Sequence, residues 1–437
     1  MLFWVTTANY IDRSVFSNLA PELQSRIGWT AGQYWYMQIA FNAAYAVSLL
    51  IGGRLMDVLG LRWGFTLAVA FWGLASMSHA LVSTVMGFFV VRILLGLGEG
   101  SNFPAAIKTV AEWFPKRERA FATGLFNSGS NVGGILVPIL VASLLPVLSR
   151  TRVGTVLPFL SDTQFGSHFI GWRGAFLVTG VIDLTWILVW LRVYRPPQDH
   201  PKVSAEELAI IHSEPPEPQV RVPWRRLFGF RQTWAFAIGK GLTDCMWWFF
   251  LFSAPLFFAD RFHFDAKARE LPVACIYIFS SFGSIAGGWV AGYFIKIGWS
   301  VNKARKVTML TAAVLVAPVF YAAMTNVAWT AVALFTLAAS AHQAWSANLY
   351  SLVGDMFPRR VVASVTGLGG MAGSIGAMIL FFYAGHIRDA AQARGEIGDY
   401  LPIFAAASVA YVVAWLAVQS LAPKLEPAAI DVKAAAA

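Results

Sequence analysis

The sequence predicts an all-α polytopic membrane protein with twelve transmembrane helices in two pseudo-symmetric six-helix bundles, on three observations. Hydrophobic residues make up 57% of the 437 residues and charged residues only 13%, about half of the roughly 25% charge that soluble domains carry. Apolar stretches recur along the whole chain, and each is near the length of about 20 residues that a helix needs to cross a bilayer. One segment of the first half of the chain also recurs in the second half.

Twelve apolar stretches have the length of a transmembrane helix. They lie at about 1–20, 32–52, 62–82, 85–107, 119–147, 171–192, 231–259, 271–295, 304–325, 328–352, 362–387 and 400–421. Alternate connections are basic, such as "KRERA" (116–120) and "NKARK" (302–306). Because basic loops stay on the cytoplasmic side, we expect both termini in the cytoplasm. Only eleven residues precede Asp12, so we expect native residues upstream of the first span.

The loop at 193–230 is rich in Pro and charge and divides six spans from six. We therefore expect an N-terminal six-helix bundle over 1–192, a cytoplasmic linker over 193–230, and a C-terminal six-helix bundle with a short cytoplasmic tail over 231–437. Within the linker, Ser204 followed by Glu207 forms a capping-box pattern, which predicts a short surface helix.

The internal repeat joins "EWFPKRERAFATGLFNSGSNVGG" (112–134) to "DMFPRRVVASVTGLGGMAGSIGA" (355–377), which align without gaps. In both, Phe-Pro is followed by two basic residues and then by Thr-Gly-Leu. Each copy lies between the fourth and fifth spans of its half. Two parallel six-span halves around a site near the midplane are an architecture of secondary transporters.

The net charge of +10 is spread over short connections, so we expect a lipid bilayer and no nucleic acid as partner. We expect no cofactor, no metal site and no catalytic residues, because no ATP-binding P-loop, H-E-x-x-H or G-x-S-x-G motif occurs. A membrane enzyme such as an acyltransferase is the alternative class, but such enzymes usually place their polar clusters at the membrane surface. A transporter-like sensor without turnover is a third class, which only a flux assay distinguishes.

Charged residues inside predicted spans are the strongest functional signal. A charge at the bilayer centre costs about 2.5–3.5 kcal/mol on insertion scales, so it usually has a function. The first span carries Asp12 and Arg13, and the fourth carries Arg92 and Glu99. Arg92 and Glu99 share a helix face but lie about 10 Å apart along the axis, too far to pair directly. They are either members of structural ion pairs or a proton carrier, Glu99, with a cation that tunes it.

The seventh and tenth spans carry further polar groups. Lys240 and Asp244 are four residues apart on one helix face and can pair. The pair is either self-neutralised or a site where Lys240 meets an anionic substrate. In "HQAWSANLY" (342–350), we interpret Trp345 with Gln343 and Asn348 as a platform for a sugar.

The connection after the second span, "GGRLMDVLGLRWG" (52–64), resembles the loop signature of the major facilitator superfamily, although Val58 and Leu61 replace two basic positions. The resemblance implies the fold of that family and a gating role for Asp57 and Arg62.

Longer stretches resemble one branch, the anion:cation symporter family, and especially its hexuronate permeases. They include "NYIDRSVFSNLAPEL", "RILLGLGEGSNFPAAIKTVAEWFPKRERAFATGLFNSG" and "AHQAWSANLYSLVGDMFPRR". The resemblance implies proton-coupled uptake of an organic anion by a multi-pass protein of the bacterial inner membrane. The matching positions imply that Asp12 and Glu99 are protonated, that Arg13 and Arg92 hold the anion or tune coupling, and that Tyr10 and Tyr45 line the cavity.

The chain departs from related aldonate permeases in the fifth span, where "NSGS" (127–130) replaces their "TSGQ". Asn127 and Asn131, one turn apart, are candidates to replace the lost hydroxyl contacts. We therefore expect a hexuronate such as glucuronate or galacturonate, with an aldonate such as galactonate or an aromatic acid as the alternative. We expect a monomer. Asp183 in the sixth span has no role that the sequence explains.

Overall fold

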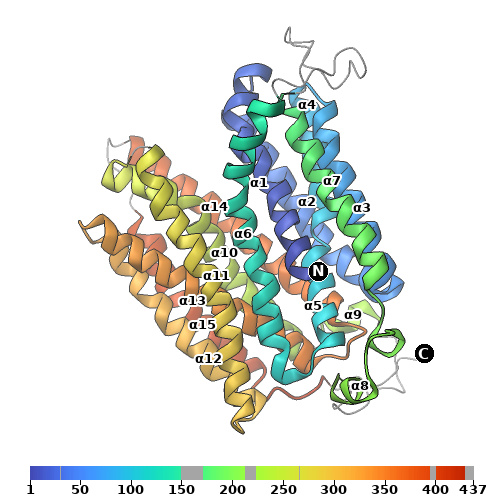
Figure 1. The fold of residues 1–437 in the computed structure, drawn as a ribbon. Coiled ribbons are helices and arrows are strands. Elements are labelled where there is room, and N and C mark those ends of the chain that lie inside the picture. Colours follow the sequence, from blue (N-terminus) through green and yellow to red (C-terminus); the bar gives the residue numbers. More distant parts are fainter. Residues whose placement is uncertain (30, 149–170, 212–222, 265, 394–399, 429–437) are drawn as a thin grey trace. The chain divides into compact units, whose positions relative to one another are not determined.

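The computed structural model describes residues 1–437 apart from 30, 149–170, 212–222, 265, 394–399 and 429–437. Within the described residues, the chain is helical and contains no β-strand. Each of the twelve predicted spans coincides with helical backbone (Figure 1). The predicted all-α fold class is confirmed.

The helices of the first part of the chain are α1 (Leu2–Ile27), α2 (Ala31–Leu59), α3 (Leu61–Ser78), α4 (Val85–Glu99), α5 (Asn102–Trp113), α6 (Lys116–Leu148) and α7 (Arg173–Val193). Two short helices follow, α8 (Ala205–Ile211) and α9 (Trp224–Leu227). The remaining helices are α10 (Arg231–Phe262), α11 (Ala266–Lys296), α12 (Val301–Val316), α13 (Ala328–Met356), α14 (Val362–Ala393) and α15 (Leu401–Leu421).

Several helices are longer than the predicted spans. Helix α1 continues to Ile27. Its last turns carry charged residues, among them the pair Glu22–Arg26 at 3.1 Å, so hydropathy alone ended the predicted span before them. The predicted short helix of the linker is present as α8. Its start is capped as expected, since the Glu207 N–H donates to Ser204 Oγ at 3.1 Å, whereas 212–214 of the predicted helix lie outside the described residues.

Nine helical segments among the described residues are long and apolar enough to cross a membrane by length and composition. Three long helices, α1, α10 and α13, do not meet that standard. They carry Asp12 and Arg13, Lys240 and Asp244, and "HQAWSAN", and these groups lower their mean hydropathy. The three helices that fail the standard therefore each carry predicted site residues, although Arg92 and Glu99 lie on a segment that meets it.

The internal repeat is visible as two matching interruptions. Helix α5 ends at Trp113 and α6 begins at Lys116, while α13 ends at Met356 and α14 begins at Val362. Phe-Pro lies in both interruptions, and a residue before proline avoids the helical conformation. Phe357 is accordingly extended, with φ −121° and ψ 146°.

The chain forms two compact units, one of Met1–Ala105 with Gly129–Arg195 and the other of Ala106–Ser128 with Pro196–Ala437. In the first, α2 packs on α4, and α3 and α1 pack on α7. In the second, α11 packs on α13, and α10 packs on α14 and α15. The predicted division into bundles over 1–192 and 231–437 stays a prediction.

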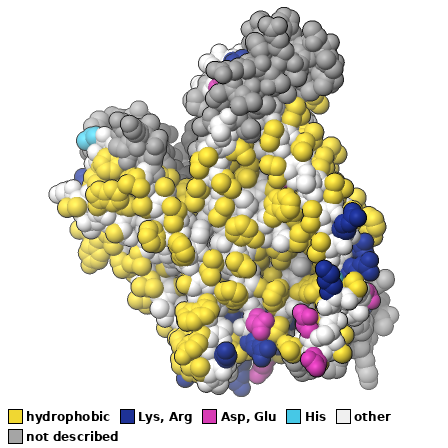
Figure 2. Space-filling model, in the orientation of Figure 1, with side chains coloured by type: hydrophobic (Ala, Val, Ile, Leu, Met, Phe, Trp, Pro, Cys, Tyr) yellow, Lys and Arg dark blue, Asp and Glu magenta, His cyan; other side chains and the backbone are white. Residues whose placement is uncertain are grey.

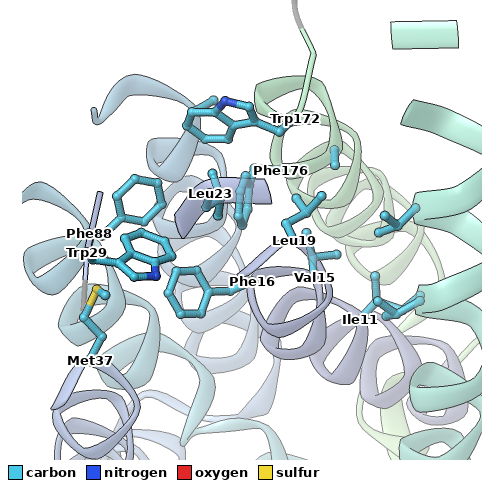
Figure 3. Packing of buried hydrophobic residues seen from close by; sticks show 14 residues of the cluster. Ile11, Val15, Phe16, Leu19, Leu23, Trp29, Met37, Phe88, Trp172 and Phe176 are labelled. Atoms are coloured by element: carbon cyan, nitrogen blue, oxygen red, sulfur yellow. The ribbon is translucent and has the colours of Figure 1, made fainter. Parts of the chain in front are cut away.

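The first unit has an aromatic core at one end of α1 (Figure 3). Phe16 lies 5.7 Å from Trp29 and 5.9 Å from Phe88, measured between ring centroids. Trp172 and Phe176 complete the cluster from the α7 side. Figure 2 shows that hydrophobic side chains cover most of the visible helical surface, whereas charged side chains gather at its lower edge. An apolar outer surface is what a lipid environment requires.

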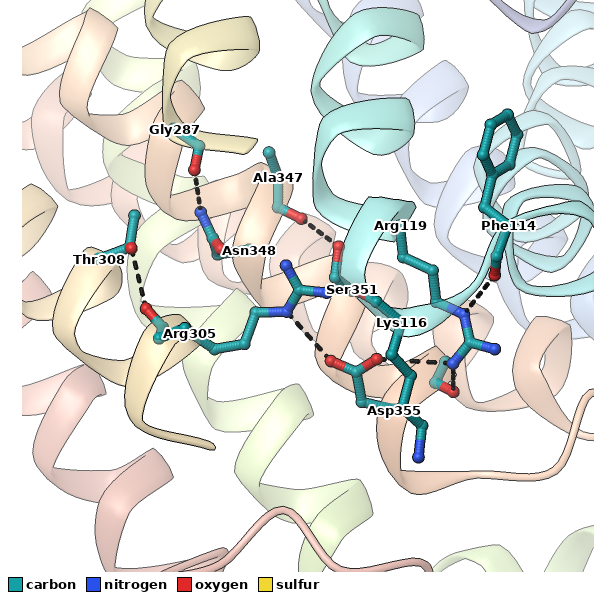
Figure 4. A network of polar contacts seen from close by, with 12 residues as sticks. Phe114, Lys116, Arg119, Gly287, Arg305, Thr308, Ala347, Asn348, Ser351 and Asp355 are labelled. Atoms are coloured by element: carbon teal, nitrogen blue, oxygen red, sulfur yellow. Dashed lines mark hydrogen bonds and ion pairs between the residues drawn. The ribbon is translucent and has the colours of Figure 1, made fainter. Parts of the chain in front are cut away.

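The second unit contains a buried ion network that the sequence analysis did not identify (Figure 4). Arg305 Nε donates to Asp355 Oδ2 at 3.1 Å, and Arg119 Nη1 lies 3.5 Å from Asp355 Oδ1. The two guanidinium groups also donate to the backbone oxygens of Gly354 and Lys116, at 2.5 and 2.7 Å. One carboxylate thus holds two buried cations, and with them the starts of α6 and α12 against the end of α13.

We predict that Asp355→Asn lowers the free energy of unfolding by about 3–5 kcal/mol, because it leaves two buried guanidinium groups without their anion. Denaturant unfolding in detergent, followed by tryptophan fluorescence, measures the change. Glu426→Gln is the matched control, because Glu426 pairs with Lys424 at 3.9 Å on the surface and exposed pairs contribute little. Equal stability of the two variants would contradict the network's role.

Candidate functional site

Asp12 and Arg13 are neighbours on α1 but reach different partners. Arg13 donates from Nε and Nη2 to Glu99 Oε2, at 3.1 and 3.0 Å. The exposed fraction of Arg13 is 7% and that of Glu99 is 0%, so this ion pair is excluded from solvent. Charge-assisted hydrogen bonds of this kind are roughly twice as strong as neutral ones. The pair joins α1 to the end of α4.

Aromatic rings surround the Arg13 guanidinium. Its central carbon lies 4.9 Å from the Tyr10 ring, 4.5 Å from the Tyr45 ring and 5.2 Å from the Phe41 ring. Cation–π contacts within about 6 Å are favourable, and more so away from water. The two tyrosines that were predicted to line a cavity therefore lie against Arg13, where their hydroxyl groups are near a charged guanidinium.

Arg92 does not reach Glu99 directly, as the helix geometry predicted. Its Nη2 donates to Gln38 Oε1 at 2.5 Å. Its guanidinium lies 4.7 Å from the Phe16 ring and 4.2 Å from the Phe41 ring. Gln38 in turn donates to Tyr34 OH at 2.9 Å. Phe41 thus lies beside both arginines, and the two cations share one aromatic partner.

Asp12 faces α3 and α7. The Ser76 hydroxyl donates to Asp12 Oδ1 at 2.7 Å and lies 3.1 Å from Thr179 Oγ1. All three side chains are buried. Asp12 is therefore held by neutral partners here, whereas Glu99 is held by a cation. The two carboxyls that the sequence analysis paired as proton sites have different surroundings.

A close helix crossing positions Glu99. A Cβ atom at Gly96 would lie 2.5 Å from the Phe41 backbone oxygen and 3.2 Å from the Tyr45 nitrogen, so only glycine fits at that position. Helices α2 and α4 can then approach each other closely, as small residues allow in membranes. This approach brings Tyr45, Phe41 and Glu99 to the same Arg13.

The second unit holds a second group of predicted residues. Lys240 Nζ lies 2.5 Å from Asp244 Oδ2 and 4.1 Å from the centre of the Tyr350 ring. Asn127 Nδ2 donates to Gln343 Oε1 at 2.6 Å and to Ser284 Oγ at 3.4 Å. Asn127 and Gln343, predicted separately as substrate contacts, are direct partners. Asn131, one turn along α6, is also buried but belongs to the first unit.

Trp345 and Asn348 lie within helix packing. Trp345 is fully buried and meets the Tyr411 ring edge-on, with centroids 5.8 Å apart. The Asn348 amide donates to the backbone oxygens of Gly287 and Ala344, at 3.0 and 2.9 Å. Of the predicted sugar platform, Gln343 is thus the member that meets another candidate residue. The substrate roles of all three stay predictions.

The predicted gating residues lie at the turn between α2 and α3. Arg62 Nη2 donates to the Leu191 backbone oxygen at 3.1 Å, and the Trp190 indole donates to the Arg62 backbone oxygen at 3.2 Å. These bonds hold the turn to the end of α7. The gating role of Asp57 and Arg62 stays a prediction.

Sequence reasoning missed three residues of the first group: Gln38, Ser76 and Thr179. A signal for each was present, because a polar side chain inside an apolar span is a functional candidate by default. They were not selected, because they are uncharged and the charged residues Asp12, Arg13 and Glu99 gave a stronger signal. Polar but uncharged residues in α2, α3 and α7 complete the partners of the charged ones.

The arrangement can exchange one carboxylate for another. A guanidinium that is held by one oxygen of a buried carboxylate and by aromatic rings can bind the carboxylate of a small molecule through two parallel hydrogen bonds. The two anions then compete for it, and protonation of Glu99 removes one competitor. Within the described residues, no group of three or more His, Cys, Asp and Glu side chains is placed to hold a metal ion.

Comparisons with known proteins agree with one another. The profile of the Major Facilitator Superfamily matches residues 2–381. A hexuronate transporter of Escherichia coli (strain K12) is 29% identical over 411 residues, covering 92% of this chain and 88% of the relative. A galacturonate transporter of Dickeya chrysanthemi is 30% identical over 312 residues, covering 70% of this chain and 84% of the relative.

Solved structures show the same fold. The crystal structure of an E. coli fucose:proton symporter matches with a TM-score of 0.65 at 15% identity, covering 96% of this chain and 97% of that one. A proton:xylose symporter bound to a halogenated glucose matches with a TM-score of 0.67 at 14% identity, covering 99% and 98%. At these identities the likeness concerns the fold.

Substitutions at Lys240 and Asp244 distinguish the two interpretations of that pair. We predict that Lys240→Gln and Asp244→Asn each cost about 3–5 kcal/mol of stability by leaving one buried charge, and that the double variant is more stable than either. Thermal unfolding in detergent measures this.

Transport by the same double variant then decides the role of Lys240. A purely structural pair predicts that uptake recovers together with stability. A substrate contact predicts a stable protein with at least tenfold weaker substrate binding.

Proposed function

Because the chain belongs to the Major Facilitator Superfamily and is a membrane transporter, not an enzyme, we propose that it imports a hexuronate such as glucuronate or galacturonate together with protons. Its relatives are transporters of hexuronate, galacturonate and galactonate, which makes a sugar acid its substrate class. We further propose that the import is proton symport by alternating access.

The buried Arg13–Glu99 ion pair is the observation that carries the proposal. A sugar acid presents one carboxylate and several hydroxyl groups. Arg13 offers a bidentate donor for the carboxylate, and the rings of Tyr10 and Tyr45 lie beside it. Arg92 and Gln38 add a second cation and an amide on the adjoining helices.

Coupling follows from competition for Arg13. While Glu99 is charged, it occupies the guanidinium through two hydrogen bonds. When Glu99 takes up a proton, its attraction for Arg13 falls and the guanidinium can bind the substrate carboxylate. The buried charge count stays balanced, because one anion replaces another. Substrate and proton therefore bind together and are released together, as symport requires.

We also infer that the chain lies in the cytoplasmic membrane as a monomer with both termini in the cytoplasm. The basic stretches at 116–120 and 302–306, which lie at the starts of α6 and α12, support this orientation by the positive-inside rule. Galactonate is the second candidate substrate, because relatives named as galactonate transporters match at 24% and 26% identity.

Uptake into proteoliposomes tests the function. We expect labelled glucuronate or galacturonate to accumulate when the lumen is alkaline relative to the medium, and to equilibrate only when a protonophore is present. Galactonate, an aromatic acid and neutral glucose complete the panel. Accumulation that follows a sodium gradient at constant pH would contradict proton coupling, and uptake of none of the acids would contradict the substrate class.

Glu99→Gln tests the coupling step. Gln keeps the shape of the side chain but cannot be charged, so Arg13 is permanently available to the substrate. We predict that accumulation driven by a pH gradient is lost, while exchange of labelled for unlabelled substrate persists within a few-fold of the original rate.

The matched control is Glu22→Gln, which removes a carboxylate from the same unit at its partly exposed pair with Arg26. It should transport normally. Undiminished accumulation by Glu99→Gln would exclude Glu99 as the proton carrier.

A further inference from the structure

A second carboxyl lies beside Asp12 and takes no part in the mechanism above. Asp183 on α7 is fully buried and interacts electrostatically with Asp12. Ser76, which donates to Asp12, also contacts Thr179, one turn before Asp183 on the same helix. Among the described residues, neither oxygen of Asp183, nor Oδ2 of Asp12, receives an N–H or O–H donor with hydrogen-bond geometry. The Trp72 indole also interacts with Asp183, without reaching that geometry.

Two ionised carboxylates cannot lie in contact in a buried site, because like charges repel and neither is solvated. A single proton between them removes the conflict. It turns one acceptor into a donor, so that Oδ2 of Asp12 and one oxygen of Asp183 gain a hydrogen bond. Carboxyl pairs in other proteins share a proton in this way, and the proton belongs to the pair and to neither residue alone.

Neutral donors hold the Asp12 side of the pair in place. The Ser76 hydroxyl occupies Oδ1 of Asp12 at 2.7 Å, which leaves Oδ2 for Asp183. Thr179 lies one helical turn before Asp183, contacts Ser76 at 3.1 Å and donates to the Phe176 backbone oxygen at 3.2 Å. The Asp12 carboxyl thus has a fixed direction.

The backbone brings Asp183 to this position. A Cβ atom at Gly73 would lie 3.0 Å from Cβ of Asp183, and one at Gly180 would lie 2.7 Å from the Gly73 backbone oxygen. The two glycines let α3 and α7 cross closely, with Asp183 directly over the crossing. A larger residue at Gly73 would displace the carboxyl.

The nearest charged groups do not neutralise the pair. Glu99 on α4 adds negative charge to its surroundings, and the cation Arg13 is bound to Glu99. His79, directly after the end of α3, donates to the Ala75 backbone oxygen at 2.9 Å and interacts electrostatically with Arg92. No described cation contacts Asp12 or Asp183 in an ion pair.

We propose that Asp12 and Asp183 form a carboxyl pair that shares one proton, so that Asp183 is the second half of the proton site assigned to Asp12. The pair retains its proton when Glu99 is charged, and it releases that proton only when its surroundings change during transport. The role of this pair in transport rests on the proton coupling proposed above. The shared proton itself does not depend on that coupling.

Infrared spectroscopy of purified protein tests the shared proton without transport. The experiment compares the native protein with the Glu99→Gln variant, so that any signal of Glu99 itself is identified. We expect a protonated-carboxyl band at neutral pH that shifts in deuterium oxide. Asp183→Asn should remove it, because the Asn amide donates to Asp12 and leaves Asp12 charged. Thr185→Val, on the same helix with its hydroxyl bonded to the Val181 backbone oxygen, should leave the band unchanged.

An unchanged band in Asp183→Asn would overturn the proposal. If that variant does not fold, Gly73→Ala is the second test, because it keeps both carboxyls but separates them. It should shift or weaken the band, and a band of unchanged position and size would contradict the pair.

In transport, Asp183→Asn in the native background should move the pH midpoint of driven uptake by about one unit or more toward acid, with substrate exchange retained. If the unmodified protein shows no proton-driven uptake while the band behaves as expected, the proposed function fails and the pair stands.

Discussion

The buried ion pair between Arg13 and Glu99 is the interaction on which the account depends. Two charges in the apolar interior of a membrane protein are stable only when they hold each other. Here the aromatic rings of Tyr10, Phe41 and Tyr45 enclose the guanidinium, and the close crossing at Gly96 brings α2 and α4 together around it. The same constraint explains Asp355, which holds two buried arginines in the second unit.

A buried ion pair of this kind can also change its bonding when its surroundings change. Its partners are held by charge, so a change in protonation or the arrival of a competing anion alters the balance between them. Asp12 is placed differently, since the Ser76 hydroxyl donates to it and we propose Asp183 as its second partner. Under our proposals, the two acidic residues that appear equivalent in the sequence have separate tasks, one coupled to the substrate through Arg13 and one held in a carboxyl pair.

Much of the fold was predictable because it follows from hydropathy and from local rules. All twelve spans, the capped helix at Ala205–Ile211 and the matching breaks at the two Phe-Pro sequences agree with the structure. The charged site residues were also predictable, since charge inside a span is rare. Their partners were not. Arg13, and not Arg92, pairs with Glu99, and Asn127 pairs with Gln343. These pairings depend on helix rotation and on crossings between helices distant in sequence, which the periodicity of one span does not encode.

The exchange of anions at Arg13 is tested most directly by counting the protons that accompany substrate binding. Calorimetric titration of purified protein with the transported sugar acid, in buffers of different ionisation enthalpy at one pH, measures that number. The account predicts net proton uptake on binding at neutral pH in the native protein and its loss in Glu99→Gln. Binding without proton uptake in the native protein, at a pH where the gradient drives transport, would contradict it.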